Sequence, residues 1–426
     1  MTPGARFQEA VALLEAIASS DRPADGTVSA FVRARRYMGA KDRRAVTTLA
    51  WGVLRHRARL TWHVEARRGT PTPRTLALAS LLLVDGQAPA AVRALFDARG
   101  RTPHEPPPLS SAEGALIDAL AGRTLADPAQ PLAVRLEIPA WLPDRLAPVW
   151  GDDTEAELAA LLPEAPLDLR VNTLKADRDT AVAALAAEGI ATIPGTLSPW
   201  ALRAEGRPNV AASAAFQQGL VEVQDEGSQL IALLTEAGPG MAVLDLCAGA
   251  GGKTLALAAA MENKGTLVAT DVSAGRLERA RTRLHRAGVH NVTRRVLDAE
   301  TGRWLKRRKG SFDRVLVDAP CSGTGTWRRN PDARWRLTPA QVESLCAEQA
   351  GVLARAADLV RPGGRLVYAT CSLLPEENEG QITAFLAAHP DYRPHPAPDG
   401  QPWHRFTPAR HGTDGFFVAV LDRIVP

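Results

Sequence analysis

The sequence predicts an α/β protein whose last part is a doubly wound, mostly parallel sheet, preceded by a helical part and a small part of mixed strands and helices. Three observations predict this fold class. From Met241 onward, short apolar runs alternate with amphipathic helical segments, which is typical of a parallel sheet covered by helices. Residues 1 to about 125 carry helical periodicity, and residues from about 150 to 235 mix both kinds of element.

The first part is predicted to be helical because apolar residues recur on one helical face. They stand at positions i, i+3, i+4, i+7 and i+8, namely Val46, Leu49, Ala50, Val53 and Leu54. Basic residues surround that face: Arg33, Arg35, Arg36, Lys41, Arg43, Arg44, Arg55, Arg57 and Arg59. Prolines predict a loop over 102–111, and the stretch 126–143 is interpreted as a linker into the next part.

The middle part mixes element types. LDLRVNTLK, residues 167–175, predicts a strand, and DRDTAVAALAAEGI, residues 177–190, predicts a helix that ends at Gly189.

The strands predicted in the last part have the sequences MAVLDLC, GTLVATD, NVTRRVLD, FDRVLVDAP and GRLVYATCS. Helices are predicted at about 253–262, 273–287, 339–360 and 375–388. The 339–360 helix has its own start signal, because Thr338 and Gln341 match a capping box and Pro339 occupies the first helical position. Ligands of such sheets bind beyond the carboxyl ends of the strands. The unusual residues fall there: Cys247, Asp271, Asp298, Asp318, Cys321 and Cys371.

The composition favours a cytoplasmic protein and permits an acidic partner. The chain has 426 residues, 45% of them hydrophobic, with a net charge of +4 and a pI near 9.0. Its longest apolar run, Leu76 to Val84, is too short to span a bilayer, and the first residues lack the order of a signal peptide. The four cysteines have no C-x-x-C spacing, so neither a zinc site nor a disulfide framework is predicted, and a reducing compartment is favoured.

The stretch LDLCAGAGGKT, Leu244 to Thr254, predicts a loop that binds a nucleotide-like ligand. A Walker loop needs glycine where Cys247 stands, and a dinucleotide loop needs its third glycine where Thr254 stands. The loop follows a strand and opens a helix, and Asp271 ends the next strand, where a carboxylate can bind two ribose hydroxyls. Taken alone, this loop and acid fit NAD and S-adenosylmethionine equally well.

Two of the four cysteines differ from the common free cysteine, which is a small buried hydrophobe. Cys346 lies in the apolar pattern of a helix, and Cys247 is also expected to pack. Cys321 and Cys371 stand at strand ends beside the loop, and each is followed by serine. Either thiol can serve as a nucleophile there, and spacing alone does not choose between them.

LDLCAGAGGKT, VDAPCSGTG and YATCSLLPEENE resemble the motifs of the NOL1/NOP2/Sun family of RNA cytosine-5 methyltransferases. The resemblance covers about Val221 to Val420, includes VQDEGSQL (223–230), and implies a class I (Rossmann-like) methyltransferase fold. The whole layout is similar to that of the bacterial 16S rRNA methyltransferases of Sun/Fmu type in this family. It implies a NusB-like helical RNA-binding domain at 1–135, a small α+β RNA-binding subdomain at 136–235 and the catalytic domain at 236–426.

The resemblance implies that the protein methylates C5 of a cytosine in RNA. Cytosine C5 is a poor nucleophile until a thiolate adds at C6, and cysteine is well suited to such covalent catalysis. By this resemblance Cys371 attacks C6, Cys321 assists release, Asp318 holds the N3/N4 edge of the base, and Lys253 lies close to the base. One departure is Ala250, because family members usually have proline there, which leaves the loop less rigid.

The resemblance also implies S-adenosylmethionine as the cofactor, and the spacing of the cysteines and histidines predicts no metal site. The expected binding residues are Cys247, Ala248, Gly249, Ala250, Gly251, Gly252, Lys253, Asp271, Asp298 and Asp318. Among them, the loop is expected to hold the methionine part and Asp298 to lie near the adenine.

The expected partner is RNA, with 16S ribosomal RNA favoured over transfer RNA by the layout, and the target cytosine must be flipped or single-stranded. RWLKRRKG (303–310) and WRRNPDARWR (327–336) can bind phosphates and stack on bases, and each is equally well a solvated basic face. A monomer without membrane contact suffices. Three alternatives stay open: an NAD-dependent oxidoreductase, which leaves Cys321 and Cys371 without a role; a P-loop ATPase, which Cys247 disfavours; and a non-catalytic RNA-binding or assembly factor.

Overall fold

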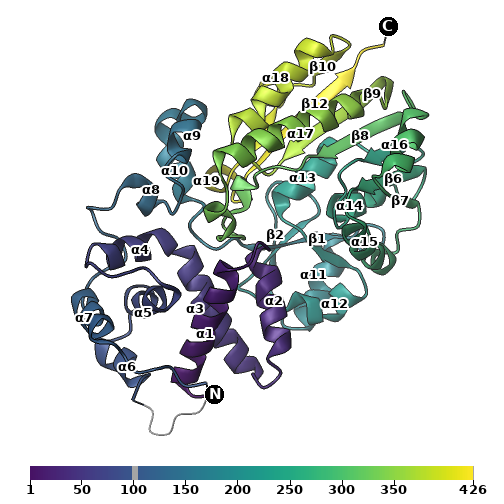
Figure 1. Ribbon diagram of the computed structural model, residues 1–426. Helices are drawn as coiled ribbons and strands as arrows, with labels where there is room; N and C mark the ends of the chain where they lie inside the picture. Colours follow the sequence, from purple (N-terminus) through teal and green to yellow (C-terminus); the bar gives the residue numbers. More distant parts are fainter. Residues whose placement is uncertain (98–103, 426) are drawn as a thin grey trace. The chain divides into compact units, whose positions relative to one another are not determined.

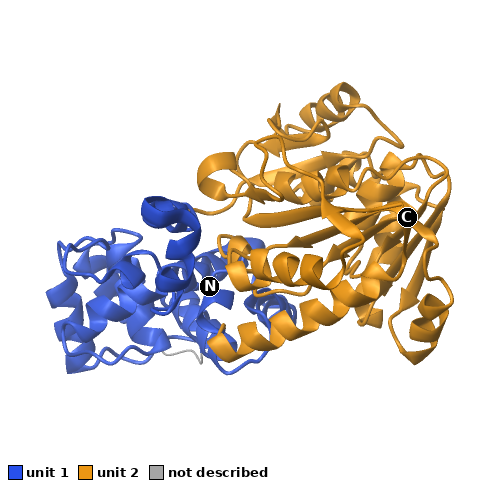
Figure 2. Cartoon of the chain, turned by 90° about the horizontal axis from the view of Figure 1, so that it is seen from above, with its two compact units in different colours: residues 1–162, 329–336 blue, residues 163–328, 337–426 orange. Residues whose placement is uncertain are grey.

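The computed structural model describes residues 1–97 and 104–425, which form two compact units. One unit comprises residues 1–162 with 329–336, and the other comprises residues 163–328 with 337–426 (Figure 2). The finer division of the chain at residues 135 and 235 stays a prediction.

The first unit is helical in its described residues (Figure 1), as predicted for residues 1 to about 125. The stretch 126–143, which was interpreted as a linker, contains a short helix at Leu132–Arg135. The helices of the unit are α1 (Pro3–Ala18), α2 (Ala24–Ala34), α3 (Ala40–Arg55), α4 (Arg57–Glu65), α5 (Pro73–Leu83), α6 (Pro89–Ala94), α7 (Ser111–Leu120), α8 (Leu132–Arg135), α9 (Leu142–Trp150) and α10 (Thr154–Ala159). The predicted helical face lies on α3, where Val46, Ala50, Val53 and Leu54 are buried in the core of the unit. The predicted loop is free of helix from 104 to 110, and residues 102 and 103 lie outside the described residues.

Residues Arg329–Arg336 belong to the first unit although they follow the DAPCSGTG stretch in the sequence. The backbone N–H of Ala24 donates to Asp332 (3.0 Å), and Arg334 donates to the carbonyl of Glu137 (2.9 Å). Arg334 is fully buried, and this burial lowers its pKa to about 10. The basic stretch 327–336 therefore contributes at least this arginine to packing and not to an RNA-facing surface.

The second unit begins with a four-stranded antiparallel sheet in the order β2-β3-β1-β4. The strands are β1 (Leu167–Val171), β2 (Thr192–Pro194), β3 (Ala201–Ala204) and β4 (Val221–Val223), with helices α11 (Arg178–Ala187) and α12 (Ala214–Gln217) between them. The predicted strand at 167–175 and the predicted helix at 177–190 are thus present in shorter form. The chain leaves α11 through Gly189, whose φ of +74° is the left-handed conformation that glycine adopts without strain.

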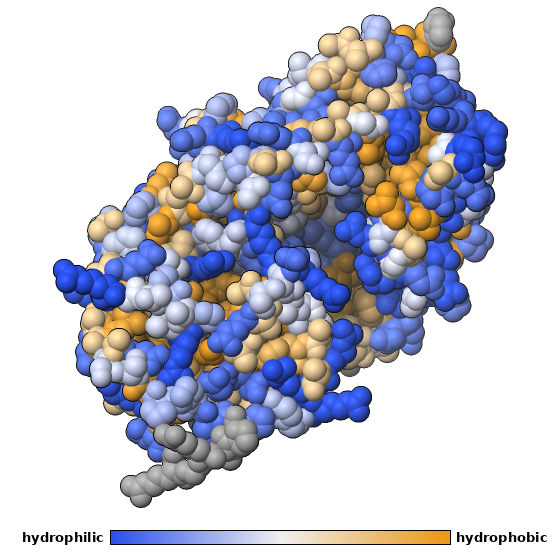
Figure 3. Space-filling model, in the orientation of Figure 1, coloured by the Kyte–Doolittle hydropathy of each residue, from blue (hydrophilic) through white to orange (hydrophobic). Residues whose placement is uncertain are grey.

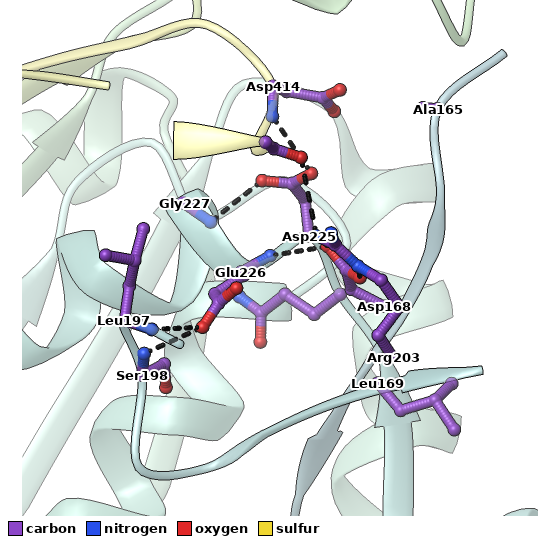
Figure 4. A network of polar contacts seen from close by, with 12 residues as sticks. Ala165, Asp168, Leu169, Leu197, Ser198, Arg203, Asp225, Glu226, Gly227 and Asp414 are labelled. Atoms are coloured by element: carbon purple, nitrogen blue, oxygen red, sulfur yellow. Dashed lines mark hydrogen bonds and ion pairs between the residues drawn. The ribbon is translucent and has the colours of Figure 1, made fainter. Parts of the chain in front are cut away.

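A buried polar network holds the VQDEGSQL segment against this small sheet (Figure 4). Asp168 on β1 accepts hydrogen bonds from Arg203 Nε (2.7 Å) and from the backbone N–H of Glu226 (3.3 Å). Asp225 accepts from the backbone N–H of Asp414 (3.1 Å), a residue near the end of the chain. Asp168 is buried, and the side chain of Asp225 is only 6% exposed. Because both carboxylates are also hydrogen-bonded, the segment that precedes the large sheet is fixed in position.

The large sheet is mostly parallel, as predicted, with the strand order β10-β12-β9-β8-β5-β6-β7 and β11 paired to β12. Strands β5, β6, β7, β8 and β9 pair in parallel. At one side β12 runs antiparallel to β9, and β10 and β11 each pair antiparallel with β12. The bounds are β5 (Ala242–Asp245), β6 (Thr266–Asp271), β7 (Val292–Val296), β8 (Phe312–Asp318), β9 (Val360–Thr370), β10 (Tyr392–Pro394), β11 (His404–Phe406) and β12 (Phe416–Arg423). Order and direction are those of a class I methyltransferase sheet.

Helices cover both faces of this sheet because its buried strands are apolar on both sides. Val243 and Leu267 pack in a core with residues of α13 (Glu226–Leu234) and α14 (Gly252–Ala260). Their neighbours Leu244 and Val268 point to the opposite core. That core contains residues of α16 (Ala299–Lys306), α17 (Pro339–Ala357) and α18 (Glu379–Ala388). The remaining helices of the unit are α15 (Ala274–Ala287) and α19 (Pro408–His411).

Two of the predicted helices differ in detail from the structure. The capping box at Thr338 and Gln341 is present, but α17 ends at Ala357, and β9 begins at Val360, where the sequence predicted helix. The helix predicted over 375–388 is interrupted, since a 3₁₀ turn at Pro375–Glu377 precedes α18. The break at Asn378, with φ −115° and ψ −99°, allows the Glu377 side chain to turn into the site described below.

Hydrophilic residues dominate the face of the molecule in Figure 3, and hydrophobic residues there form separate small groups. Among the described residues, no helix combines the length and the apolar character that crossing a membrane requires.

Candidate active site

The carboxyl ends of the parallel strands bring the predicted site residues to one edge of the large sheet. Asp271 ends β6, Asp318 ends β8, and Cys371 directly follows β9. The glycine-rich loop lies between Asp245, the last residue of β5, and Gly252, the first residue of α14. The structure thus joins residues that are more than 100 positions apart in the chain, as expected of a doubly wound sheet.

The glycine-rich loop is held by its backbone. Gly249 and Gly251 have φ values of +57° and +82°, which glycine adopts most readily, so the loop turns tightly before α14. The N–H of Gly249 donates to Asp271 (2.9 Å), and the N–H of Ser273 donates to the other oxygen of the same carboxylate (2.8 Å). A carboxylate has about four acceptor positions, so Asp271 can hold the loop and still accept from ribose hydroxyls.

A cavity of about 370 Å³ lies beside Asp298, near the ends of β6 and β7. Val272, Leu297 and Leu305 give it apolar walls, and Asp298 lines it. Asp298 caps α16 by accepting from the N–H of Thr301 (2.8 Å), and this backbone hydrogen bond lowers the pKa of its carboxyl. Charged residues also line the cavity, namely Asp358, Lys306, Lys309 and Arg355. Its apolar residues together with the Asp298 acceptor suit a flat heterocycle that carries an amino group, such as adenine.

Lys253 and Asp318 form an ion pair at 2.8 Å. Burial by itself would lower the pKa of Lys253, but the neighbouring Asp318 carboxylate outweighs it, and the pKa is raised. Lys253 therefore keeps its proton at neutral pH and fixes the direction of the Asp318 carboxylate. The ammonium also interacts electrostatically with Cys371.

The two thiols selected from the sequence face each other. The Sγ atoms of Cys321 and Cys371 are 3.4 Å apart, although the residues lie on different loops. The contact with Cys371 and burial raise the pKa of the Cys321 thiol well above its usual value. Cys321 therefore keeps its proton at neutral pH, and its S–H can donate toward the Cys371 sulfur.

Sequence reasoning missed Glu377, the residue that joins the two cysteine loops. Its buried carboxylate accepts from the N–H of Ser322 (2.8 Å), from Gln349 Nε2 (2.9 Å), and from the hydroxyls of Ser322 and Ser372. Each serine directly follows one of the cysteines, so this one side chain sets the spacing of the two sulfurs. The sequence contained a partial signal, since a Cys-Ser pair occurs in each loop and PEEN follows the second.

Asp245 is a second residue that the sequence prediction did not select. Its side chain is fully buried, one oxygen accepts from Thr254 Oγ1 (2.6 Å), and the other has no hydrogen-bond partner among the described residues. Burial, with a smaller contribution from the nearby Asp318 carboxylate, raises the pKa of this carboxyl to about 7. An acceptor left without a partner inside a protein is uncommon and points to a ligand donor or to water.

The remaining cysteines behave as expected. Cys247 is partly buried, packs at the edge of one core of the large sheet, and burial raises the pKa of its thiol. Cys346 lies on α17 and its Sγ is 3.4 Å from the carbonyl oxygen of Glu376. No group of three or more metal-binding side chains occurs among the residues that the structure describes.

The donor set fits S-adenosylmethionine. Asp245, Asp271 and Asp318 stand at the ends of adjacent strands with Lys253 as the cation paired among them, so negative charge is in excess. That excess suits the sulfonium and ammonium charges of the cofactor. Loop residues Cys247 to Gly252 supply a turn with little side-chain bulk for the methionine part, and the apolar residues of the cavity beside Asp298 suit the adenine.

Of the basic stretches singled out in the sequence, 303–310 is partly engaged within the fold. The guanidinium groups of Arg295 and Arg308 lie over the Trp304 ring, 4.5 and 4.7 Å from its centroid. In the other stretch Trp327 is fully buried. Neither tryptophan is therefore placed to stack on a base in this conformation.

The comparisons with known proteins agree on one family. The model of the 16S rRNA methyltransferase RsmB/F family matches residues 232–422, and the model of the RsmF/B-like ferredoxin-like domain matches residues 138–211. The probable ribosomal RNA small subunit methyltransferase B of a Synechocystis strain is 35% identical over 68% of each chain. The ribosomal RNA small subunit methyltransferase B of Salmonella arizonae is 31% identical, over 89% of this chain and 90% of that protein.

Solved structures agree with these matches. The crystal structure of PH0851 is 27% identical and superposes with a TM-score of 0.81 over 99% of both chains. A methyltransferase homolog protein from Pyrococcus horikoshii is 28% identical, with a TM-score of 0.61 over 69% of this chain and 98% of that one.

Proposed function

Since the chain belongs to the RsmB/F family of 16S rRNA methyltransferases, which use S-adenosylmethionine, we propose that it methylates C5 of a cytosine in 16S rRNA through a covalent bond between Cys371 and C6. The observation that carries this proposal is the 3.4 Å contact between the sulfurs of Cys321 and Cys371 beside the cofactor loop. An NAD-dependent oxidoreductase, a P-loop ATPase or a passive RNA-binding factor has no use for two thiols in that position.

The reaction needs a nucleophile that adds to the base and later leaves. The Cys371 thiolate forms a bond to C6, and the ring electrons make C5 nucleophilic. Bound S-adenosylmethionine would supply the methyl group for C5: its S–CH3 bond would break, the electron pair would stay on sulfur, and S-adenosylhomocysteine would be the leaving group. The C5 proton then passes to water, the C6–S bond breaks, and its electron pair returns to the Cys371 sulfur.

The neighbouring groups have separate roles in these steps. The protonated Cys321 thiol, 3.4 Å away, donates a hydrogen bond that stabilises the departing Cys371 thiolate. Asp318 binds the N3/N4 edge of the cytosine, and Lys253, bonded to it at 2.8 Å, keeps its carboxylate oriented. Glu377 positions both thiols through Ser322 and Ser372.

The cofactor residues are proposed from the same geometry. We assign the methionine part to the loop Cys247–Lys253, the ribose to Asp271 and the adenine to the cavity beside Asp298, with Asp318 close to the reacting methyl group. The chain is proposed to act as a monomer in the cytoplasm, where its thiols stay reduced.

Three cysteine variants test the proposed roles, with Cys346→Ala as the matched control thiol on α17. Cys371→Ala should abolish methylation of 16S rRNA. Cys321→Ala should accumulate protein bound covalently to RNA, seen as a band that survives denaturation, and the double variant should lose that band. A band that requires Cys321 and persists without Cys371 would reverse the two roles.

Bisulfite sequencing of total RNA from a deletion strain tests the substrate. One cytosine in 16S rRNA should lose its 5-methyl mark and regain it when the wild-type gene is restored, but not with Cys371→Ala. Loss of a mark in transfer RNA alone would instead support the transfer RNA alternative.

A further inference from the structure

Gln224, Arg170 and Arg283 meet near the first residue of α14 and have no part in the steps described above. Arg170 lies on β1 and is 1% exposed, and its Nε donates to Oε1 of Gln224 at 2.7 Å. Because Oε1 is the acceptor, the amide Nε2 of Gln224 lies on the other side, where it donates one hydrogen to Ser228 Oγ (3.3 Å) and carries a second. A Cβ placed on Gly252 would lie 3.9 Å from that nitrogen.

Arg283 reaches the same place from α15. Its Nη1 donates to the carbonyl of Ala250 in the cofactor loop (2.7 Å), and its Nε lies 3.4 Å from Glu222. The remaining Nη2 would be 3.8 Å from a Cβ on Gly252. Two side-chain donors therefore face the start of α14, where free backbone N–H groups also point outward.

The charge around this point is positive. Arg170, Arg283 and Arg286 interact with a single carboxylate, that of Glu222. Burial lowers the pKa of Arg170 to about 10, so its guanidinium group is still charged at neutral pH. One carboxylate does not balance three cations.

The cluster is also incomplete within the chain. Nη1 of Arg170 is buried and has no hydrogen-bond partner among the described residues, whereas nearly all buried donors in proteins are paired. Gly252 itself is partly exposed, and a Cβ there would meet no atom nearer than 3.8 Å. A site made of donors, with excess positive charge and open space, fits a small oxyanion.

We propose that Gln224, Arg283 and the start of α14 form an oxyanion site, with Arg170 as the residue that orients Gln224. If the proposed function holds, two of the molecules that the protein binds carry an oxyanion that could occupy this site. The carboxylate of S-adenosylmethionine is one, because the adjoining loop is expected to hold the methionine part. A backbone phosphate of the RNA substrate is the other, because β1 and Gln224 lie in the part expected to bind RNA.

Two variants test the site, and Arg281→Gln on the same helix is the control, since Arg281 is exposed and pairs with Glu278. Arg283→Gln removes one donor group. Gln224→Glu keeps the volume and still gives Arg170 an acceptor, but it replaces the donor with a negative charge. Thermal unfolding of each variant verifies that it folds.

Calorimetric titration measures binding of S-adenosylmethionine and of its decarboxylated analogue, and a second titration series measures binding of a single-stranded RNA oligonucleotide at several salt concentrations. A lost charge-assisted hydrogen bond corresponds to about a tenfold or larger loss of affinity. If the oxyanion is the cofactor carboxylate, both variants should bind S-adenosylmethionine at least about tenfold more weakly and should bind the decarboxylated analogue as the wild type does. If RNA is the source, only RNA binding should weaken, and for Arg283→Gln the slope of log K against log salt should become shallower by about 0.7.

The proposal is overturned if both variants bind S-adenosylmethionine and RNA as Arg281→Gln does. Because these readouts are equilibrium affinities, they do not depend on either cysteine. Failure of the covalent mechanism would leave the outcome of this test intact, and the two failures are therefore distinguishable.

Discussion

Replacing Glu377 should loosen the two cysteine loops together. Its carboxylate is fully buried and accepts from the N–H of Ser322, from Gln349 and from two serine hydroxyls, one on each loop. The substitution Glu377→Ala removes this acceptor and leaves the donors buried without a partner. Each donor that finds no other acceptor lowers the free energy of unfolding by roughly 1–3 kcal/mol. After partial relaxation we expect a loss of about 3–5 kcal/mol in the free energy of unfolding. Glu377→Gln retains an acceptor on one side and should lose about 1–3 kcal/mol.

Activity should respond more strongly than stability. The sulfurs of Cys321 and Cys371 are 3.4 Å apart, and we expect them to separate when Ser322 and Ser372 lose their common acceptor. A displacement of about 1 Å in an active site can lower the rate by about 100-fold. We therefore expect Glu377→Gln to remain folded and to methylate RNA about 10- to 100-fold more slowly than the wild type.

Urea denaturation and single-turnover methylation of 16S rRNA measure the two effects. Glu376→Gln is the matched control, because it makes the same chemical change one residue away on a partly exposed side chain. Our reasoning about the network is refuted if Glu377→Ala unfolds at the wild-type urea midpoint and methylates RNA at the wild-type rate.

Two further predictions concern the titratable groups of the site. Burial raises the pKa of Asp245 to about 7, above the value of 3.8 in an unfolded chain. Between these two pH values the folded state binds more protons than the unfolded state. The free energy of unfolding therefore falls as the pH rises through this range. From pH 5 to pH 8 the wild type should lose about 2–3 kcal/mol of unfolding free energy through this group, and Asp245→Asn should not. The prediction is wrong if the difference in unfolding free energy between the two proteins is the same at every pH. In the second, diamide should join Cys321 to Cys371 in a disulfide, because an S–S distance of 3.4 Å needs little movement to reach bonding distance. The two electrons and two protons pass to diamide, the mass falls by about 2 Da, methylation stops and dithiothreitol restores it. Unchanged mass and activity under diamide would exclude this contact in solution.

Much of the fold was predictable because periodicity and strand order are local properties. Alternating apolar runs gave the parallel strands with errors of a few residues at their ends, and the capping box at Thr338 was correctly placed. The errors arose where tertiary contacts override local pattern. The 375–388 segment has helical composition, yet it breaks at Asn378 because Glu377 bonds to side chains on other loops. Strands β10, β11 and β12 were not predicted individually. β10 and β11 have only three residues each, and β12 lies outside the alternation of strands and helices from which the other strands were predicted.

The sequence by itself determined which residues reach the active edge of the sheet. Parallel strands end at the same edge, so a carboxylate or thiol just after each strand must be near the others, and the cofactor loop, Asp271, Asp318, Cys321 and Cys371 followed from that rule. Only the tertiary structure decided how these side chains pair. The contact between the two sulfurs, the ion pair of Lys253 with Asp318 and the position of Glu377 depend on distances of a few ångströms between loops that lie roughly 50 or more residues apart. Such distances are set by packing of the whole domain, and no local pattern in the chain encodes them.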